Sequence, residues 1–213
     1  MKIALIGATG FVGFKVLREA LQRGHHVTAL TRDPSKVAAA PQLTVLAAEA
    51  TDATAVARAV RGHDAVVSAY NGPRGQANFH ELYLAGVRAV IAGVEHADLE
   101  RLLWVGGAGS LFVAPGVQLV DTPQFPAEYR TEAQAARDAL NLFREETAIA
   151  WSFVSPAPLL APGQRTGSFR LGGDQVLMDG DKPGRISVED LAVAIVDELE
   201  SPRHVRQRFT LAY

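Results

Sequence analysis

Short apolar runs alternate with amphipathic stretches along most of the chain. The runs cover residues 3–6, 27–31, 43–46, 64–70, 101–105, 150–154 and 208–212, and they are typical of strands buried on both faces of a sheet. Between them, apolar residues recur at helical spacing over 11–21, 53–61, 78–96, 129–143 and 187–200. Strands that alternate with helices predict an α/β fold, a doubly wound parallel sheet with helices on both faces.

Two stretches show no clear period and carry many glycines and prolines. They span about residues 107–130 and 156–186, after the fifth and sixth predicted strands. Because the carboxyl ends of parallel strands share one edge of the sheet, we expect both stretches to form a small, loop-rich substrate lobe there. We predict one domain over residues 1–213.

The first strand runs directly into a glycine-rich turn, Gly7-Ala-Thr-Gly10-Phe-Val-Gly13, and then into a helix. This context makes a glycine motif indicate dinucleotide binding in a Rossmann-type fold. Gly7 permits the tight turn, Gly10 lets the backbone approach a diphosphate, and Gly13 lets the helix pack closely on the strand. Backbone N–H groups at the helix start would face the anion. The predicted cofactor contacts in this turn are Gly7, Thr9, Gly10, Phe11, Val12 and Gly13.

The end of the second strand bears on the choice between NAD and NADP. NAD-selective folds place an acidic residue there to bind the ribose 2′-hydroxyl, whereas this chain has Arg32, whose guanidinium suits a 2′-phosphate. Asp33 is the alternative acid. However, Asp33-Pro34 also fits a helix N-cap followed by proline at the first helical position. We therefore favour NADP(H) over NAD(H).

Further cofactor contacts are expected where the third and fourth strands end. Glu49 lies just past the third strand, where it could contact the adenine or simply face solvent. Ser68, Ala69 and Tyr70 close the fourth strand at the same edge, and Tyr70 could also offer a stacking surface.

Composition and charge exclude several kinds of protein. The net charge of −2 provides no basic footprint for nucleic acid or an anionic membrane, and no apolar stretch reaches the roughly 18 residues that span a bilayer. The chain contains no cysteine, so disulfides and cysteine-ligated metals are excluded, and no metal site is predicted. We expect a cytoplasmic protein, monomer or homodimer, that acts on a small-molecule acceptor. A subunit contact is the alternative to burial for the apolar helix 78–96.

The glycine turn resembles that of the atypical short-chain dehydrogenase/reductases, including the group described as NADH–flavin reductases. The likeness extends over nearly the whole chain. It is carried by the segments 64–68, 104–110, 121–123, 125–126, 151–157, 162–167 and 186–190, among which Val-Gly-Gly-Ala-Gly-Ser (105–110) and Pro-Gly-Gln-Arg-Thr-Gly (162–167) are the more specific.

The resemblance implies an NAD(P)H-dependent reductase of flavins, such as FMN or FAD, or of similar conjugated acceptors. Its relatives include biliverdin-reductase-B-like flavin reductases and transcription-linked NADP sensors. It also implies that Ser155, Pro156 and Ala157, which follow the sixth strand, approach the nicotinamide. A non-catalytic NADP sensor is the alternative function, and a nucleotide-sugar epimerase or dehydratase is a third.

The wider superfamily places a serine after the fifth strand and a Tyr-x-x-x-Lys motif on the next helix. Ser110 matches the serine, and Tyr129 is the candidate tyrosine, but Ala133 stands where the lysine belongs. A tyrosine has a pKa of about 10, so using its anion at pH 7 would cost roughly 4 kcal/mol without a nearby cation. Alcohol oxidation is therefore disfavoured, whereas hydride transfer to a conjugated acceptor requires mainly positioning.

Three more residues are candidates for the substrate site. Trp151 and Phe169 could stack on an aromatic acceptor. Arg165, in the predicted lobe, could meet an anionic acceptor or form a surface salt bridge.

Overall fold

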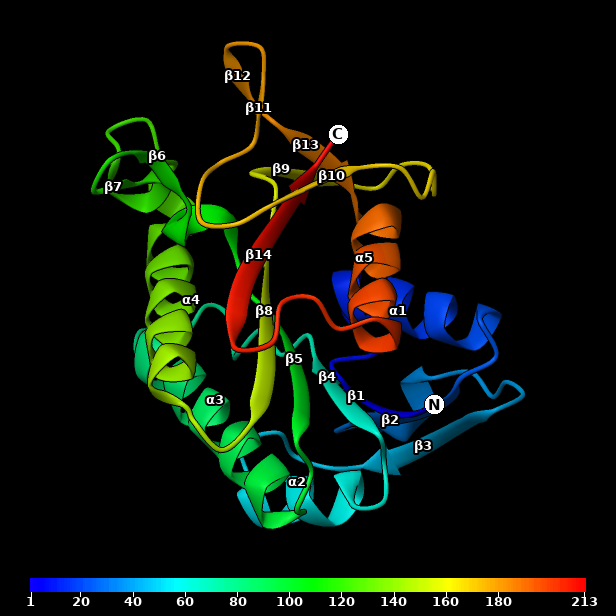
Figure 1. Cartoon of the computed structure of the whole chain (residues 1–213). Coiled ribbons are helices and arrows are strands. Elements are labelled where there is room, and N and C mark those ends of the chain that lie inside the picture. The colour runs from blue at the N-terminus through cyan, green and yellow to red at the C-terminus, as the bar shows by residue number, and fades with distance from the viewer.

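A central sheet of eight strands organises the molecule, and the computed structural model describes all residues, 1–213 (Figure 1). The strands are β1 (Lys2–Ile6), β2 (His26–Thr31), β3 (Leu43–Ala47), β4 (Ala65–Ser68), β5 (Arg101–Val105), β8 (Ala150–Pro156), β10 (Arg170–Gly172) and β14 (Gln207–Ala212). Their order is β10-β14-β8-β5-β4-β1-β2-β3, and all pairs are parallel except β10 with β14. The strand order reverses between β1 and β4, and open parallel sheets bind ligands outside the carboxyl ends of strands at such a reversal.

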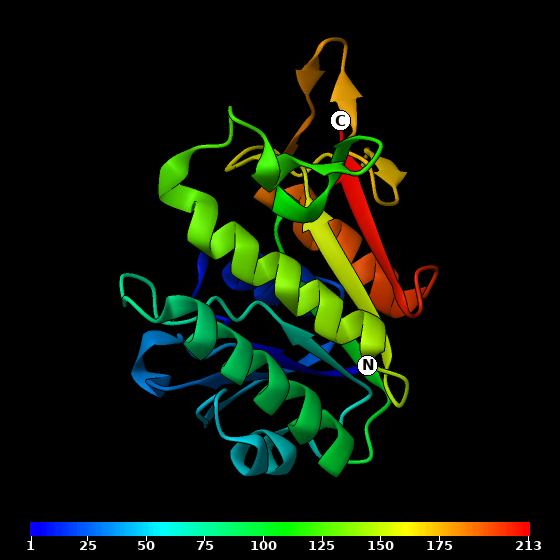
Figure 2. The same cartoon turned by 90° about the vertical axis from the view of Figure 1, so that its left-hand side faces the viewer.

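Five helices cover the two faces of the sheet (Figures 1 and 2). They are α1 (Phe11–Gln22), α2 (Ala53–Val60), α3 (Phe79–His96), α4 (Ala127–Glu145) and α5 (Val188–Glu200). The helices α2, α3 and α4 pack on one face and α1 and α5 on the other, so the sheet separates two apolar cores. This arrangement confirms the predicted doubly wound fold. None of the helices is long and apolar enough to cross a membrane.

The central strands are mostly apolar because successive side chains enter different cores. In β1, Ala4 and Ile6 belong to the core under α2, α3 and α4, whereas Ile3 and Leu5 belong to the core under α1 and α5. The same packing explains the apolar residues on more than one face of α3, since α2 and α4 contact it from two sides (Figure 2). Packing within the chain buries most of them, including Val87, Val90 and Val94.

Some predicted boundaries differ from the observed ones. The strand predicted over 64–70 ends at Ser68, and α4 begins two residues before Tyr129. The strand β8 continues beyond Val154 to Pro156, because β14 pairs with it as far as Pro156. That pairing joins segments far apart in the sequence, so a local pattern could not predict it.

The two irregular stretches contain short strands at the carboxyl edge of the sheet (Figure 1). These are β6 (Phe112–Ala114), β7 (Val117–Gln118), β9 (Leu159–Ala161), β11 (Met178–Asp179), β12 (Lys182–Pro183) and β13 (Arg185–Ser187). They pair only in twos, β6 with β7, β9 with β13 and β11 with β12. The loops that follow β5 and β8 therefore build up above the same edge at which β1 and β4 end.

Candidate functional site

The glycine turn between β1 and α1 leaves no room for side chains at two positions. Gly7 has a φ of +83°, and a Cβ atom there would lie 2.6 Å from the carbonyl oxygen of Ala69. A Cβ atom on Gly13 would lie 2.0 Å from the carbonyl oxygen of Gly7. The first glycine therefore permits the turn and the third permits close packing of α1 on β1, as the sequence predicts.

The amino end of α1 has no acidic side chain that would compete with a bound anion for its backbone N–H groups. Gly10 is its N-cap, no side chain caps the helix, and its first turn contains no acidic residue. The first backbone N–H groups of a helix have no partner within it and form the positive end of its dipole. Phe11 and Val12, in this first turn, line one of the two cavities described below. The turn and the helix end together fit the diphosphate of a dinucleotide.

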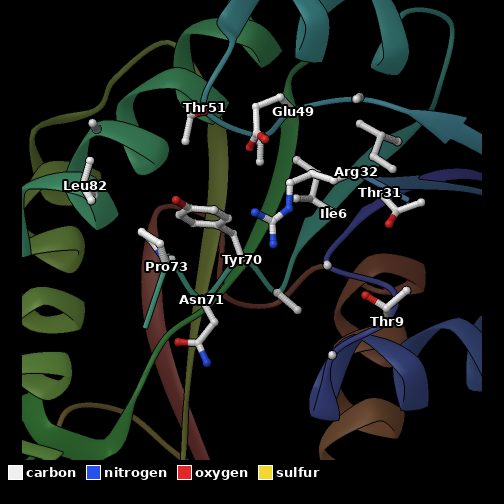
Figure 3. Close-up of a pocket in the computed structure, with 18 of the residues that line it drawn as sticks. Ile6, Thr9, Thr31, Arg32, Glu49, Thr51, Tyr70, Asn71, Pro73 and Leu82 are labelled. Atoms are coloured by element: carbon white, nitrogen blue, oxygen red, sulfur yellow. The ribbon is translucent and has the colours of Figure 1, made fainter. Parts of the chain in front are cut away.

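A first cavity of about 550 Å³ lies at the carboxyl ends of β1, β2 and β4, beside the start of α3 (Figure 3). Two ionisable groups of opposite charge line it, Arg32 after β2 and Glu49 after β3. Its other lining residues include Gly7, Thr9, Gly10, Ala69, Tyr70, Asn71, Leu82 and Ala85. The cavity therefore combines an apolar wall with a cation and an acceptor, at the end of the sheet where the adenosine half of a dinucleotide would bind.

Arg32 and its neighbour Asp33 have different surroundings. Arg32 points into the first cavity, toward the ring of Tyr70, and has no hydrogen-bond or salt-bridge partner in the protein (Figure 3). Asp33 does not line the cavity. Its carboxylate accepts hydrogen bonds from Ser35 N at 3.1 Å and Ser35 Oγ at 2.6 Å, which lower its pKa. Asp33 is thus the N-cap of a short 3₁₀ helix (Pro34–Lys36), as its sequence context suggests.

Tyr70 stands between the first cavity and a second one. Its ring stacks on that of Tyr83, with centroids 5.8 Å apart and planes at 13°. The ring also lies against α3 at Gly86, where a Cβ atom would come within 2.5 Å of it. Burial and the negative charge of Glu49 raise the pKa of Tyr70, although Arg32 opposes them. Tyr70 is therefore a neutral, firmly packed wall shared by the two cavities.

The second cavity, of about 1090 Å³, is larger and mostly apolar. It is bordered by the loops that follow β4, β5 and β8 and by the first turns of α4. Five residues line both cavities: Gly10, Ala69, Tyr70, Asn71 and Gly72. Arg74 and Glu132 are the only charged residues on its walls. A dinucleotide that enters the first cavity can therefore extend past the glycine turn into a cavity that also has room for an apolar second molecule.

Tyr129 lines the second cavity, and so does Ala133, at the place of the missing lysine. The Tyr129 side chain is 57% exposed and its hydroxyl has no partner in the protein. Arg130 is directed elsewhere, since its guanidinium donates to the carbonyl oxygens of Val120 and Phe125 at 2.6 and 3.1 Å. The cation next to Tyr129 in the sequence is therefore not directed at the Tyr129 hydroxyl.

Ser110 does not line either cavity. It is buried, and its Oγ accepts a hydrogen bond from Nη1 of Arg208 at 3.3 Å. Nη1 of Arg208 also donates to Oγ of Ser155 at 3.4 Å, while the rest of the guanidinium pairs with Asp174. The structure thus uses both serine hydroxyls as partners of a buried arginine, and it does not bring them to the predicted catalytic and nicotinamide contacts.

Several other predicted residues also lie away from the cavities. Ser68 and Ala157 are buried, although their neighbours Ala69 and Pro156 line the second cavity. Trp151 is buried in the core beside Phe143. Phe169 faces a separate, smaller cavity at α5 and β14.

Arg165 forms the salt bridge that was the alternative to substrate binding. Its Nε and Nη2 donate to Glu19 of α1 at 2.7 and 2.8 Å. The adjoining Thr166 and Gly167 are held by the buried carboxylate of Asp190, through backbone N–H bonds of 2.8 Å each. Residues 165–167 therefore fasten the irregular lobe to the helices and do not reach the cavities.

Several residues that line the second cavity were not predicted individually. Asn71 and Arg74 follow β4, where the carboxyl edge of the sheet could have indicated them. Other lining residues come from the two stretches predicted as the substrate lobe, namely Leu119, Thr122, Gln124, Phe125, Pro126, Leu159, Leu160 and Pro183. No local signal indicated Phe79, Tyr83 and Glu132.

Comparisons with known proteins agree with this geometry. A family model described as NAD(P)H-binding matches residues 7–202. The chain is 41% identical to the uncharacterised protein YwnB of Bacillus subtilis over 99% of its own length and 98% of YwnB. A solved structure of a candidate epimerase from Bacteroides thetaiotaomicron has a TM-score of 0.93 and 42% identity, covering 100% of this chain and 96% of that one. A candidate NADH-flavin reductase from Streptococcus pneumoniae has a TM-score of 0.87 and 32% identity, with 100% and 99% covered.

Proposed function

The chain belongs to the NAD(P)H-binding family, and we propose that it is an NADPH-dependent reductase that passes hydride to a flavin or a similar conjugated small molecule. One observation carries the proposal. The dinucleotide cradle opens directly into a large apolar cavity that lacks the tyrosine–lysine pair that related enzymes use to deprotonate an alcohol. The similarity to a candidate flavin reductase from Streptococcus pneumoniae supports the same reaction class.

The choice of NADPH depends on Arg32. Its guanidinium lies in the first cavity without a partner, whereas the carboxylate of Asp33 is occupied by Ser35. A 2′-phosphate offers oxygens that an arginine binds in a bidentate manner. Glu49, on the same cavity, would accept from the adenine amino group.

The reaction depends on positioning more than on acid–base chemistry. A bound nicotinamide dinucleotide supplies the hydride, and the conjugated acceptor holds the incoming charge. In this chain, the cavity walls would exclude water and hold the acceptor, while the free hydroxyl of Tyr129 would donate a hydrogen bond to it. Ala133 and the engaged hydroxyl of Ser110 leave no tyrosine–lysine–serine machinery. Epimerases and dehydratases that use this machinery are disfavoured for the same reason.

The direct test is NADPH oxidation by the purified protein under anaerobic conditions. FMN, FAD, riboflavin and a quinone would be offered in turn, and the loss of reduced-nicotinamide absorbance would be followed with NADPH and with NADH. We expect turnover with at least one flavin or quinone and a preference for NADPH. Tight NADPH binding without faster oxidation by any acceptor would instead favour a non-catalytic redox sensor.

We also propose that the reaction takes place in the cytoplasm, where cells maintain reduced NADP. Fractionation of the source cells, followed by immunodetection of the protein, tests this location.

A further inference from the structure

The only two charged residues on the second cavity pair with each other across two elements. Nη2 of Arg74, in the loop after β4, lies 3.3 Å from Oε2 of Glu132 on α4. Arg74 also donates to the amide oxygen of Asn71 from Nε at 3.2 Å and from Nη2 at 2.6 Å, with the amide turned so that its oxygen faces the guanidinium. The pair therefore links the β4 loop to α4 along the cavity wall.

Large apolar side chains surround the same cavity and remain exposed. Phe11, Tyr129 and Leu159 are 52%, 57% and 58% exposed, and they come from α1, α4 and β9. All three line the cavity, together with Phe125 and Leu160. Apolar groups that converge on one cavity from separate elements indicate a ligand with a large apolar surface.

We propose that the acceptor is a planar aromatic ring system that carries one anionic tail, and that Arg74 binds this tail. The inference rests on the proposed reductase function and specifies its substrate class. The ring would lie among the apolar walls. The anion would replace the Glu132 carboxylate as the partner of Arg74, because no other cation lines the cavity.

The ion pair is weak enough for such an exchange. Arg74 is 61% exposed, and exposed ion pairs contribute little because water screens them. A phosphate offers more oxygens and more charge than a carboxylate, so it competes well for one guanidinium. Asn71 would hold the guanidinium in place while its partner changes.

FMN and riboflavin form a suitable pair of probes because they differ only by the phosphate. Their dissociation constants would be measured by flavin fluorescence on protein saturated with NADP⁺, which cannot donate hydride. We expect FMN to bind about tenfold tighter than riboflavin. This ratio corresponds to the lower end of the range of free energies that hydrogen bonds to charged groups contribute. This ratio should fall as ionic strength rises.

Three variants test the role of the arginine. Arg74→Gln should abolish the preference for FMN while leaving riboflavin binding unchanged, and Arg74→Lys should retain part of it. Glu132→Gln should increase the preference, because it removes the competing carboxylate. Arg58→Gln is the matched control, since it removes an exposed arginine from α2 that lines neither cavity, and it should change neither dissociation constant.

The outcomes separate this inference from the proposed function. Equal affinity for FMN and riboflavin, or equal losses for both in Arg74→Gln, would overturn the anion site even if riboflavin is reduced. A preference for FMN that depends on Arg74, without NADPH oxidation by any acceptor, would support the anion site and refute the reductase. If neither flavin binds, the anion site is refuted, whereas the reductase is refuted only if the quinone also fails to oxidise NADPH.

Discussion

Replacement of Arg32 by alanine should weaken NADPH binding far more than NADH binding. Arg32 lines the first cavity with no partner in the protein, so its removal leaves no buried charge behind. The side chain is exposed and belongs to neither core, so the melting temperature should stay the same. The lost interaction that distinguishes the two dinucleotides is the proposed contact with the 2′-phosphate, which NADH lacks.

The expected size of the effect follows from the exposure of the guanidinium. A hydrogen bond to a charged group contributes about 1.5–3 kcal/mol, which corresponds to roughly 10- to 100-fold in the dissociation constant. Solvent screening places an exposed pair near the lower end of that range. We therefore expect about a tenfold loss for NADPH and no measurable loss for NADH. Raising the salt concentration to about 1 M should reduce the difference, because the Debye length falls to about 3 Å.

Calorimetric titration of wild type, Arg32→Ala and Arg32→Lys with NADPH and NADH measures these effects. The lysine variant keeps the charge but loses the planar fork, so its affinity for NADPH should be intermediate. Asp33→Asn is the control, because that carboxylate is held by Ser35 outside the cavity and should not affect either dinucleotide. Equal losses for both dinucleotides in Arg32→Ala would refute the 2′-phosphate contact. A selective loss of NADH binding in Asp33→Asn would make Asp33 the ribose-binding acid.

Three further predictions concern the packing around the cavities and the behaviour of the protein in acid. Gly86→Ala would place a Cβ atom within 2.5 Å of the Tyr70 ring, so NADPH titrations should show weaker binding. Gly93→Ala is the control, because its Cβ atom would meet Val56 at 2.6 Å. It should lower the melting temperature and leave the NADPH dissociation constant unchanged. Ser110→Ala should keep NADPH oxidation near the wild-type rate in the steady-state assay, because the buried hydroxyl accepts a hydrogen bond from Arg208 and does not line the cavity. A large loss in kcat with an unchanged melting temperature would contradict this placement. Burial raises the pKa of Asp190, but hydrogen bonds from Thr166, Gly167 and Tyr213 outweigh burial and leave that pKa below its usual value. The stability that Asp190 contributes should therefore be complete above about pH 5 and be lost as the pH falls through the lowered pKa, so Asp190→Asn should melt earlier at pH 7 and show a flatter decline in acid.

Local rules account for most of the secondary structure. The helix α1 starts at the glycine turn, α5 starts after Ser187, whose side chain accepts from Asp190 N, and Asp52 caps α2. Each of these signals depends on residues within a few positions of one another. Observed boundaries differ from predicted ones where a segment distant in the sequence sets the end of an element. For example, β8 continues to Pro156 because β14 pairs with it.

For the site, the order of strands and glycines was enough to predict where the first cavity lies. Gly7, Gly10, Arg32, Glu49 and Tyr70 all line the first cavity, since the carboxyl ends of parallel strands must meet at one edge. The direction of a particular polar side chain was not predictable in the same way.

The sequence by itself determined the alternation of strands and helices, the dinucleotide cradle and the absence of a lysine four residues after Tyr129. Only the tertiary structure decided which polar groups remain available for chemistry. The Ser110 hydroxyl accepts a hydrogen bond from Arg208, 98 residues away in the sequence, and Arg165 forms an ion pair with Glu19, 146 residues away. The physical reason is that a buried or paired polar group must satisfy its hydrogen bonds with whatever the fold brings near it, and those partners are not encoded in its local sequence. Arg32 and Arg74 stay candidates for ligand binding because the fold leaves the first without a partner and keeps the second largely exposed, where solvent weakens its ion pair.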